Sequence, residues 1–307
     1  MAGRMRRIAA AGAVLIMLLL CLLYAGGALD NPYRIQSDEE DGLRHGAQSD
    51  VTDDSQKERT QPGVTAGTEV YEGFLMDNVL HAGNAGDVHF HIYVPDSYDG
   101  SRPYPLFLTM SGYGGMYFQG VGVNLTKEPF ALWAKRQYPD MIIVAPQMEA
   151  WGEAYAEPVL ALMDYLLSAY RVDENRIYGE AFSAGGVTMS FVLQQRPDLF
   201  CAYLHCCSSW PADPTPVAKA RLPVYIAVGE QDEYFGSGPS RAIYGKLQER
   251  YRQQGLSGEE IDRLLVLDVK DDAYFSGRGV EKQHEGGVLF GEDPEIMGWL
   301  FEKENND

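Results

Sequence analysis

Basic side chains are scarce in this 307-residue sequence, which has 25 lysines and arginines against 44 aspartates and glutamates and a net charge of −19. So acidic a chain disfavours nucleic acid, anionic bilayers and polyanionic substrates as partners. Cysteine is also rare: beyond residue 28 there are only Cys201, Cys206 and Cys207. An odd, clustered set forms no disulfide framework, and without a CxxC pair or spaced histidines we expect no zinc site. We expect these cysteines to be small buried side chains.

Charge is absent from one stretch near the N-terminus, residues 8–29. Three arginines precede it and acidic residues follow, an order that directs the rest of the chain to the outer side of a membrane. The stretch is long enough to span a bilayer, and the small residues at 26–28 suit cleavage by a signal peptidase. Residues 1–28 are therefore predicted to be a signal peptide or an uncleaved signal anchor. Either one predicts an extracytoplasmic protein, secreted or held at the membrane.

Large apolar side chains are nearly missing from residues 37–61, so this segment cannot bury enough surface to offset its chain entropy. Residues 29–66 are predicted to be an acidic, disordered linker. Residues 67–305 are enough for one large domain, and a composition of 45% hydrophobic and 11% aromatic residues supports a real core.

Apolar patterns of two kinds alternate along this domain. Short alternating or continuous apolar runs predict strands at residues 88–94, 106–110, 141–145, 176–182, 201–207, 223–228 and 264–269. Helices are predicted at residues 129–136, 154–170, 184–194, 240–253 and 294–302. Strands that alternate with helices predict an α/β fold with a doubly wound, mostly parallel sheet. In such a sheet the functional residues gather at the carboxyl ends of the strands.

The segment around Ser183 carries the strongest chemical signal. A predicted strand runs into Ala181-Phe182-Ser183-Ala184-Gly185, and a predicted helix follows. This is close to the nucleophile elbow G-x-S-x-G, with alanine in the first glycine position. The elbow needs small residues because its turn is tight, and it places the serine hydroxyl at a helix N-terminus that favours a developing oxyanion. We predict that Ser183 is a nucleophile; the alternative is a plain helix cap.

A nucleophilic serine needs a histidine as its base, and the chain has six histidines. Four precede the serine, in the linker or in N-terminal strands: His45, His81, His89 and His91. His205 falls in a predicted core strand, where a buried, hydrogen-bonded side chain is expected. Only His284 follows the last strand, as the chain order of elbow-containing hydrolases requires, so it is selected as the base.

The acid that orients this histidine should follow the strand predicted at residues 223–228. Asp232 lies one short loop beyond that strand, where its carboxylate can meet His284. Glu230 and Glu233, in the same loop, remain open as alternatives.

The carrying motifs span nearly the whole domain: Ser111-Gly112-Tyr113-Gly114-Gly115, the elbow, Gly229-Glu230-Gln231-Asp232 and His284. With them the chain resembles the α/β-hydrolase family, nearest its esterase, poly(hydroxyalkanoate)-depolymerase-like and prolyl-oligopeptidase-like branches. The resemblance implies a second oxyanion amide at Tyr113, beside that of Ala184, the residue after the nucleophile. Two positions depart from the family. A serine replaces the histidine of the family's His-Gly pair at Ser111, which removes a loop anchor, and Ala181 replaces a glycine.

Aromatic residues crowd the loops at the predicted strand ends, and we expect Tyr117, Trp151, Trp210 and Tyr234 to line a substrate pocket. Such a pocket suits an apolar or aromatic acyl group, or a sugar ring. Residues 208–222 are too few for a lid domain, which argues against an interfacial lipase. The N-terminal stretch is too short for a gating propeller, which argues against a gated oligopeptidase.

The sequence therefore predicts an exported serine hydrolase, without cofactor or metal, that cleaves small or polysaccharide-linked carboxylic esters through an acyl-enzyme. A serine peptidase of the prolyl-oligopeptidase-like type, with the same three residues, is the first alternative. An inactive binding module on a hydrolase fold, with Ser111 and Ala181 as signs of decay, is an alternative of another class. A membrane is a partner if the N-terminal segment stays uncleaved, and nucleic acid is not expected.

Overall fold

One mixed β-sheet organises residues 63–304, the part of the chain that the computed structural model describes. The signal segment and most of the predicted linker, residues 1–62, lie outside the described residues. The strands are β1 (Gly63–Thr65), β2 (Val70–Tyr71), β3 (Phe74–His81), β4 (Asp87–Tyr93), β5 (Tyr104–Met110), β6 (Ile142–Pro146), β7 (Val172–Phe182), β8 (Ala202–Cys206), β9 (Val224–Gly229) and β10 (Leu265–Lys270).

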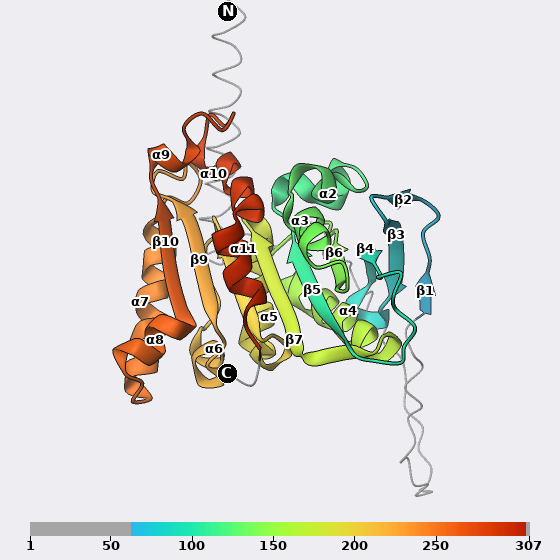
Figure 1. Ribbon diagram of the computed structural model, residues 1–307, viewed down its shortest axis with the longest axis horizontal. Helices are drawn as coiled ribbons and strands as arrows, with labels where there is room; N and C mark the ends of the chain where they lie inside the picture. The colour runs from blue at the N-terminus through green and yellow to red at the C-terminus, as the bar shows by residue number, and fades with distance from the viewer. Residues whose placement is uncertain (1–62, 305–307) are drawn as a thin grey trace, which may run out of the picture. The chain divides into compact units, whose positions relative to one another are not determined.

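The strands follow the order β1-β3-β4-β6-β5-β7-β8-β9-β10, and β2 pairs with β3 outside this path (Figure 1). The pairs from β6 to β10 are all parallel. The N-terminal strands pair antiparallel, and β4 joins them to β6, also antiparallel. The sheet is therefore mostly parallel, as predicted, with an antiparallel edge.

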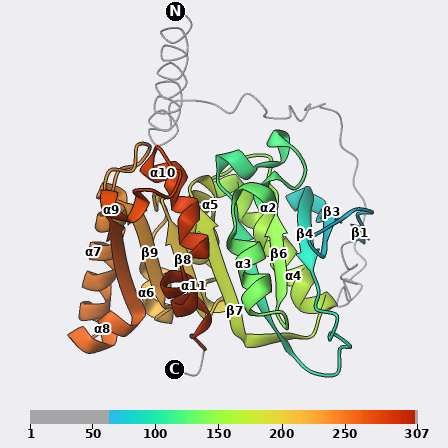
Figure 2. The same cartoon turned by 45° about the horizontal axis from the view of Figure 1, so that its top comes forward.

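Helices cover both faces of this sheet. They are α2 (Val123–Lys127), α3 (Phe130–Gln137), α4 (Ala156–Ala169), α5 (Ala184–Gln195), α6 (Thr215–Ala220), α7 (Gly238–Gln253), α8 (Gly258–Leu264), α9 (Asp272–Phe275), α10 (Gln283–Gly286) and α11 (Pro294–Phe301). Helices α3 and α11 lie on one face of the sheet and α4 to α7 on the other (Figures 1 and 2). Side chains alternate along each strand, so Leu106 and Leu108 enter a core shared with α4 to α7, while Phe107 enters one shared with α3 and α11. Within the described residues no helix combines the length and apolar character needed to cross a bilayer.

The seven predicted strands and five predicted helices are confirmed, with ends shifted by up to four residues. The predicted linker boundary at residue 66 is wrong, because Gly63–Thr65 already pairs with β3. Strand β3 itself escaped prediction. Its inward-facing positions include the buried Asn78, whose amide donates to the carbonyls of Leu75 and Phe90, so the strand shows no continuous apolar alternation.

Four loops meet at the carboxyl edge of the parallel strands. They follow β5, β7, β9 and β10, and carry Gly112, Ser183, Asp232 and His284. The chain order reverses at β5, which has β6 on one side and β7 on the other. Such a reversal opens a crevice above the strand ends, the usual ligand site of an α/β sheet. Between β8 and β9 the chain forms only α6, so this connection leaves the crevice without an inserted domain.

Candidate active site

The turn between β7 and α5 holds Ser183 in a strained conformation, with φ +50° and ψ −117°. Ala181 has no positive φ, so the first position of the elbow requires a small side chain but not a glycine. Gly185 is required by packing, because a Cβ there would lie 2.5 Å from the carbonyl oxygen of Met110. The start of α5 therefore packs directly on the end of β5, and the serine is presented at the rim of the crevice.

Two hydrogen bonds join Ser183, His284 and Asp232. Ser183 Oγ lies 2.9 Å from His284 Nε2, and His284 Nδ1 lies 2.6 Å from Asp232 Oδ2. The exposed fractions of the three residues are between 5% and 7%. Because a carboxylate only accepts hydrogen bonds, Nδ1 carries the imidazole proton and Nε2 can accept the serine proton. This is the geometry of a nucleophile with a base and an orienting acid.

The loops that carry the acid and the base are held by hydrogen bonds from their backbone amides to carboxylates. Asp232 Oδ1 accepts hydrogen bonds from two amides of its own turn, at 3.0 and 2.7 Å. The carboxylate of Glu233 accepts from the amides of Gln283 and His284, at 3.0 and 2.9 Å. Glu233, one of the two alternative acids, thus holds the backbone of the histidine and not its ring, while Glu230 is exposed.

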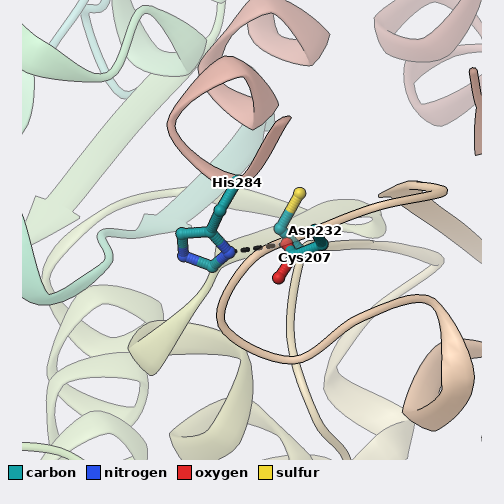
Figure 3. A group of neighbouring side chains, drawn as sticks. All are labelled: Cys207, Asp232 and His284. Atoms are coloured by element: carbon teal, nitrogen blue, oxygen red, sulfur yellow. Dashed lines mark hydrogen bonds and ion pairs between the residues drawn. The ribbon is translucent and has the colours of Figure 1, made fainter. Parts of the chain in front are cut away.

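Cys207 adjoins this acid–base pair (Figure 3). Its sulfur and one donor atom each of Asp232 and His284 lie within 4.8 Å of one another, a spacing that metal ligands can have. The aspartate and histidine atoms already share a hydrogen bond, and burial raises the pKa of the Cys207 thiol. The group is therefore built for hydrogen bonding more than for metal binding. Cys201 and Cys206 are also free and buried, as expected.

The loop after β5 lies against the nucleophile. A Cβ on Gly112 would lie 3.1 Å from the Ser183 Cβ, which leaves no room for a side chain. The Gly112 amide is already used, since it donates to the carboxyl oxygens of Glu128 at 3.0 and 3.3 Å. The amides of Tyr113 and Ala184 donate to no other residue within the described range 63–304. These are the two amides that the sequence analysis assigned to an oxyanion hole.

Two buried carboxyl groups beneath the loop and the elbow were not anticipated from the sequence. Burial raises the pKa of Glu128, which follows α2, to about 8. Burial also raises the pKa of Glu180, on β7, well above its ordinary range; its Oε2 accepts from the Thr109 hydroxyl at 2.6 Å. With a pKa of about 8, Glu128 is mainly protonated at neutral pH. No sequence pattern marks them, because an acid at a helix end or in a strand is usually exposed.

Of the aromatic residues predicted to line a pocket, Tyr234 and Trp151 lie beside the site. The Tyr234 ring meets the His284 ring edge-on, with centroids 4.5 Å apart. Trp151 packs edge-on against Tyr113, whose centroid is 5.8 Å away, and Phe118 joins the same cluster. Tyr113 and Phe118 are exposed, so this aromatic rim is open to solvent.

The other two predicted pocket residues are placed differently. Tyr117 stacks on His89 at a centroid distance of 3.8 Å and so packs against the β3–β4 hairpin. Trp210 is 6% exposed and belongs to the core, where its ring packs on Tyr203 and His205. Its prediction as a pocket residue is therefore wrong: in sequence, an aromatic that closes the core at a strand end looks like one that lines a site.

The remaining described histidines belong to other networks. His205 is fully buried on β8, with Nδ1 2.9 Å from the Tyr203 hydroxyl, and burial lowers its pKa to about 3. His81 lies between Thr65 and Asp87 at the exposed end of β3. His45, which was not selected as the base because it falls in the predicted linker, lies outside the described residues.

Comparisons with known proteins agree with this architecture. Residues 147–208, which include the elbow, match the prolyl oligopeptidase family. The chain is similar to a thermostable esterase, with 22% identity and a TM-score of 0.63. The match covers 76% of this chain but 64% of the esterase, so this chain spans less than two thirds of the esterase's length. It is also similar to a ferulic acid esterase, with 16% identity, a TM-score of 0.50 and coverage of 78% of this chain and 99% of the esterase. A glucuronoyl esterase from Solibacter usitatus has 10% identity, a TM-score of 0.52 and coverage of 80% of this chain and 88% of the esterase. No curated protein matches the sequence.

At these identities the structural likeness establishes the fold, which is the α/β-hydrolase fold. The matched family segment and the Ser183–His284–Asp232 hydrogen bonds add the chemistry. Together they give the chain the arrangement of side chains that serine hydrolases have, on a fold similar to that of esterases and with a segment similar to the prolyl oligopeptidase family.

Glu128→Gln should make the stability of the protein less dependent on pH. The unfolded carboxyl ionises near its ordinary pKa of 4.5, whereas the folded one keeps its proton up to about pH 8. The folded state binds more protons across this interval, so the free energy of unfolding falls as the pH rises through it. Glutamine can still accept from the Gly112 amide, and it removes this loss. Urea titrations at both ends of the interval should show a smaller decrease for the variant; equal decreases would contradict a protonated Glu128.

Proposed function

We propose that the protein hydrolyses carboxylic esters, with Ser183 as nucleophile, His284 as general acid and base, and Asp232 as the orienting acid. The observation that carries this proposal is the pair of hydrogen bonds, 2.9 and 2.6 Å long, that links the three side chains at the end of a strained elbow. A plain helix cap would need neither the positive φ nor the buried imidazole.

In the proposed reaction Ser183 Oγ attacks the ester carbonyl carbon while its proton passes to His284 Nε2. The imidazolium that forms is stabilised by Asp232, which also keeps the proton of Nδ1 in place. The tetrahedral intermediate then breaks its bond to the leaving alcohol, which takes the proton from Nε2. Water, deprotonated by the same nitrogen, attacks the acyl-enzyme and releases the acid and the free serine.

The negative charge of the tetrahedral intermediate develops on the former carbonyl oxygen. We assign its two donors to the amides of Ala184 and Tyr113, which have no other partner within residues 63–304. Ala184 also begins α5, so its amide lies at a helix N-terminus, where the dipole favours negative charge. Loss of one such donor lowers the rate of related hydrolases by about 10²–10³-fold.

The surroundings of the site favour an uncharged substrate with a flat apolar group. The aromatic rim of Tyr113, Phe118 and Trp151 can take up an aromatic acyl group or the face of a sugar ring. The chain carries a net charge of −19, which disfavours anionic partners. Aromatic esters and esters linked to polysaccharide are therefore the substrates that we propose first.

Ser183→Ala should abolish covalent labelling by a fluorophosphonate and lower esterase kcat by a factor on the order of 10⁴ or more. Mass spectrometry of the labelled wild-type protein should locate the adduct on Ser183. Ser190→Ala is a matched control, because Ser190 is a buried serine of α5 that donates to the Val187 carbonyl and has no contact with the imidazole. A folded wild-type protein that takes up no label would contradict the proposal and favour an inactive binding module.

Peptide hydrolysis is the second candidate, and the match of residues 147–208 to the prolyl oligopeptidase family is the observation that favours it. An aryl ester and an anilide with the same acyl group separate the two activities. We expect the ester to be hydrolysed and the anilide to stay at the background rate. Hydrolysis of both, abolished by Ser183→Ala, would make the protein a peptidase.

We also propose that the protein works outside the cytoplasm, on the strength of the uncharged stretch at residues 8–29 and the arginines before it. The full chain should be found either in the medium or on the outer face of a membrane, where added protease reaches it. Recovery in the cytosol of intact cells would rule out export.

A further inference from the structure

The loop that supplies the Tyr113 amide, residues 111–122, has a backbone that is flexible by composition. Residues 111–122 include five glycines, and glycine is the residue that gains most freedom when unrestrained. The loop forms two single 3₁₀ turns, Tyr113–Gly115 and Tyr117–Gln119, and several of its side chains are exposed. The resemblance to the α/β-hydrolase family implies a histidine that anchors this loop, and this chain has Ser111 there. Some other group must therefore hold the loop in place.

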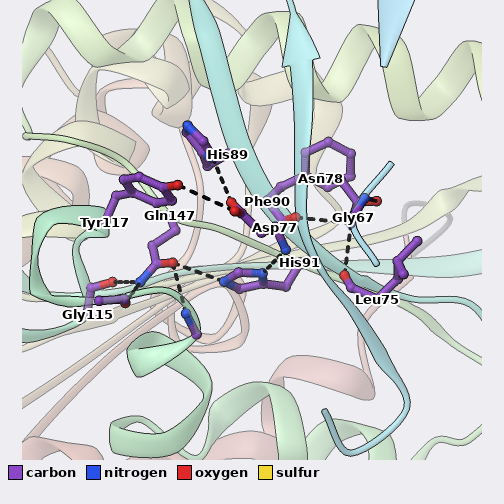
Figure 4. A network of polar contacts seen from close by, with 12 residues as sticks. Gly67, Leu75, Asp77, Asn78, His89, Phe90, His91, Gly115, Tyr117 and Gln147 are labelled. Carbon is purple, nitrogen blue, oxygen red and sulfur yellow. Dashed lines mark hydrogen bonds and ion pairs between the residues drawn. The ribbon is translucent and has the colours of Figure 1, made fainter. Parts of the chain in front are cut away.

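The side chain of Gln147 holds the loop at three points (Figure 4). Gln147 follows β6 and is 1% exposed. Its Nε2 donates to the carbonyls of Gly115 and Gly120, at 2.9 and 2.8 Å, and its Oε1 accepts from the amide of Gly122 at 3.1 Å. A single buried amide thus ties the middle of the glycine-rich stretch to its C-terminal end.

His91, on β4, determines which way this amide points. The backbone amide of Asp77 donates to His91 Nδ1 at 2.9 Å, so Nδ1 is unprotonated and the ring proton is on Nε2. His91 Nε2 lies 3.1 Å from Gln147 Oε1 and donates to it. Burial lowers the pKa of His91, which keeps the ring neutral and in this tautomer. With a flipped amide, the NH₂ group would face two donors and the oxygen would face two carbonyls.

The irregular backbone of β3 directs the Asp77 amide, the first donor in this series of hydrogen bonds, toward His91. Asp77 has φ +52° and lies where the register of β3 and β4 shifts between Leu75 and Asn78. The Asp77 carboxylate also lies 2.7 Å from His89 Nδ1, and the Tyr117 hydroxyl donates to it at 3.4 Å. Asp77 is therefore linked to the loop in two ways, directly through the Tyr117 hydroxyl and indirectly through His91 and Gln147. Both links give a reason for its strained backbone to persist.

We propose that Gln147, oriented by His91, is the positioning residue that sets the oxyanion loop and thereby the Tyr113 amide. This inference rests on the proposed function, because it assigns a purpose to the loop only if Ser183 is a nucleophile. Glu128 fixes the start of the loop through the Gly112 amide, and Gln147 fixes the rest. A displacement of about 1 Å at a catalytic group lowers rates by roughly 10²-fold. Gln147 touches no reacting atom, so its effect must pass through the loop.

Gln147→Glu tests this role, because it keeps the size of the side chain and removes both donors to the loop carbonyls. We expect kcat for an aryl acetate to fall by about 10- to 100-fold, with KM changed much less, since the lost interaction acts on the transition state. The affinity for a trifluoromethyl ketone, which forms a tetrahedral adduct with the serine, should fall by a similar factor. Amide hydrogen exchange of residues 112–122 should become faster.

Tyr251→Phe is the control. Tyr251, on α7, is also a fully buried side chain that donates to a backbone carbonyl, that of Leu222 at 3.1 Å. Its partner belongs neither to the loop nor to the β3–β4 hairpin. This variant should lose stability but keep kcat and the exchange rates of residues 112–122.

The outcomes separate the inference from the proposed function. Wild-type protein that takes up no fluorophosphonate overturns both. Wild-type protein that is labelled, together with equal kcat values for Gln147→Glu and Tyr251→Phe, overturns the inference alone. If Gln147→Glu does not fold, Gln147→Met takes its place, because methionine fills the same volume without a charge; an unchanged kcat in that variant would equally reject the role.

Discussion

The strained turn at Ser183 is the constraint on which the site depends. A residue with a Cβ holds φ near +50° only because its neighbours leave no alternative. The Ser183 amide donates to the Cys206 carbonyl at 2.9 Å, and the Ser208 hydroxyl donates to the Ser183 carbonyl at 2.6 Å. Gly185, pressed against the carbonyl of Met110, closes the turn from the other side. The strand β7, its neighbours β5 and β8, and the helix α5 thus all meet at one backbone position, and the base and acid are placed relative to it.

Around this turn, polar side chains immobilise the loops by bonding to their backbone. Glu128 accepts from the Gly112 amide, Glu233 from the His284 amide, and Gln147 bonds three groups of the oxyanion loop. A buried amide or carboxyl that is left unpaired is expensive, so each of these groups favours one loop conformation strongly. Burial raises the pKa of both buried carboxyls, which reflects the cost of placing a charge there. Preorganised loops are what the proposed chemistry requires, because oxyanion donors help most when they need not move.

Much of this could be predicted from the sequence because it is local or ordered along the chain. Apolar periodicity gave the parallel strands and their helices, since a buried strand and an amphipathic helix differ in period. The strand–turn–helix around Ser183 marked the turn, and chain order singled out His284 and the loop that holds Asp232, with Glu230 and Glu233 left as alternatives. The structure brings Ser183, His284 and Asp232 into hydrogen-bond contact. Prediction failed where polar residues occupy interior positions, as Asn78 does in β3, and where burial depends on distant elements, as for Trp210.

What the sequence by itself determined was therefore the fold class and the identity of the residues at the strand ends. Only the tertiary structure decided how those ends are held. Gln147 and His91 are 56 positions apart, and Glu128 and Gly112 are 16 apart, and no periodic pattern links such pairs. Their hydrogen bonds exist because the sheet order sets β4 beside β6, and the loop after β5 above them. The sequence names each donor and acceptor, but only burial in one place makes the bond between them obligatory.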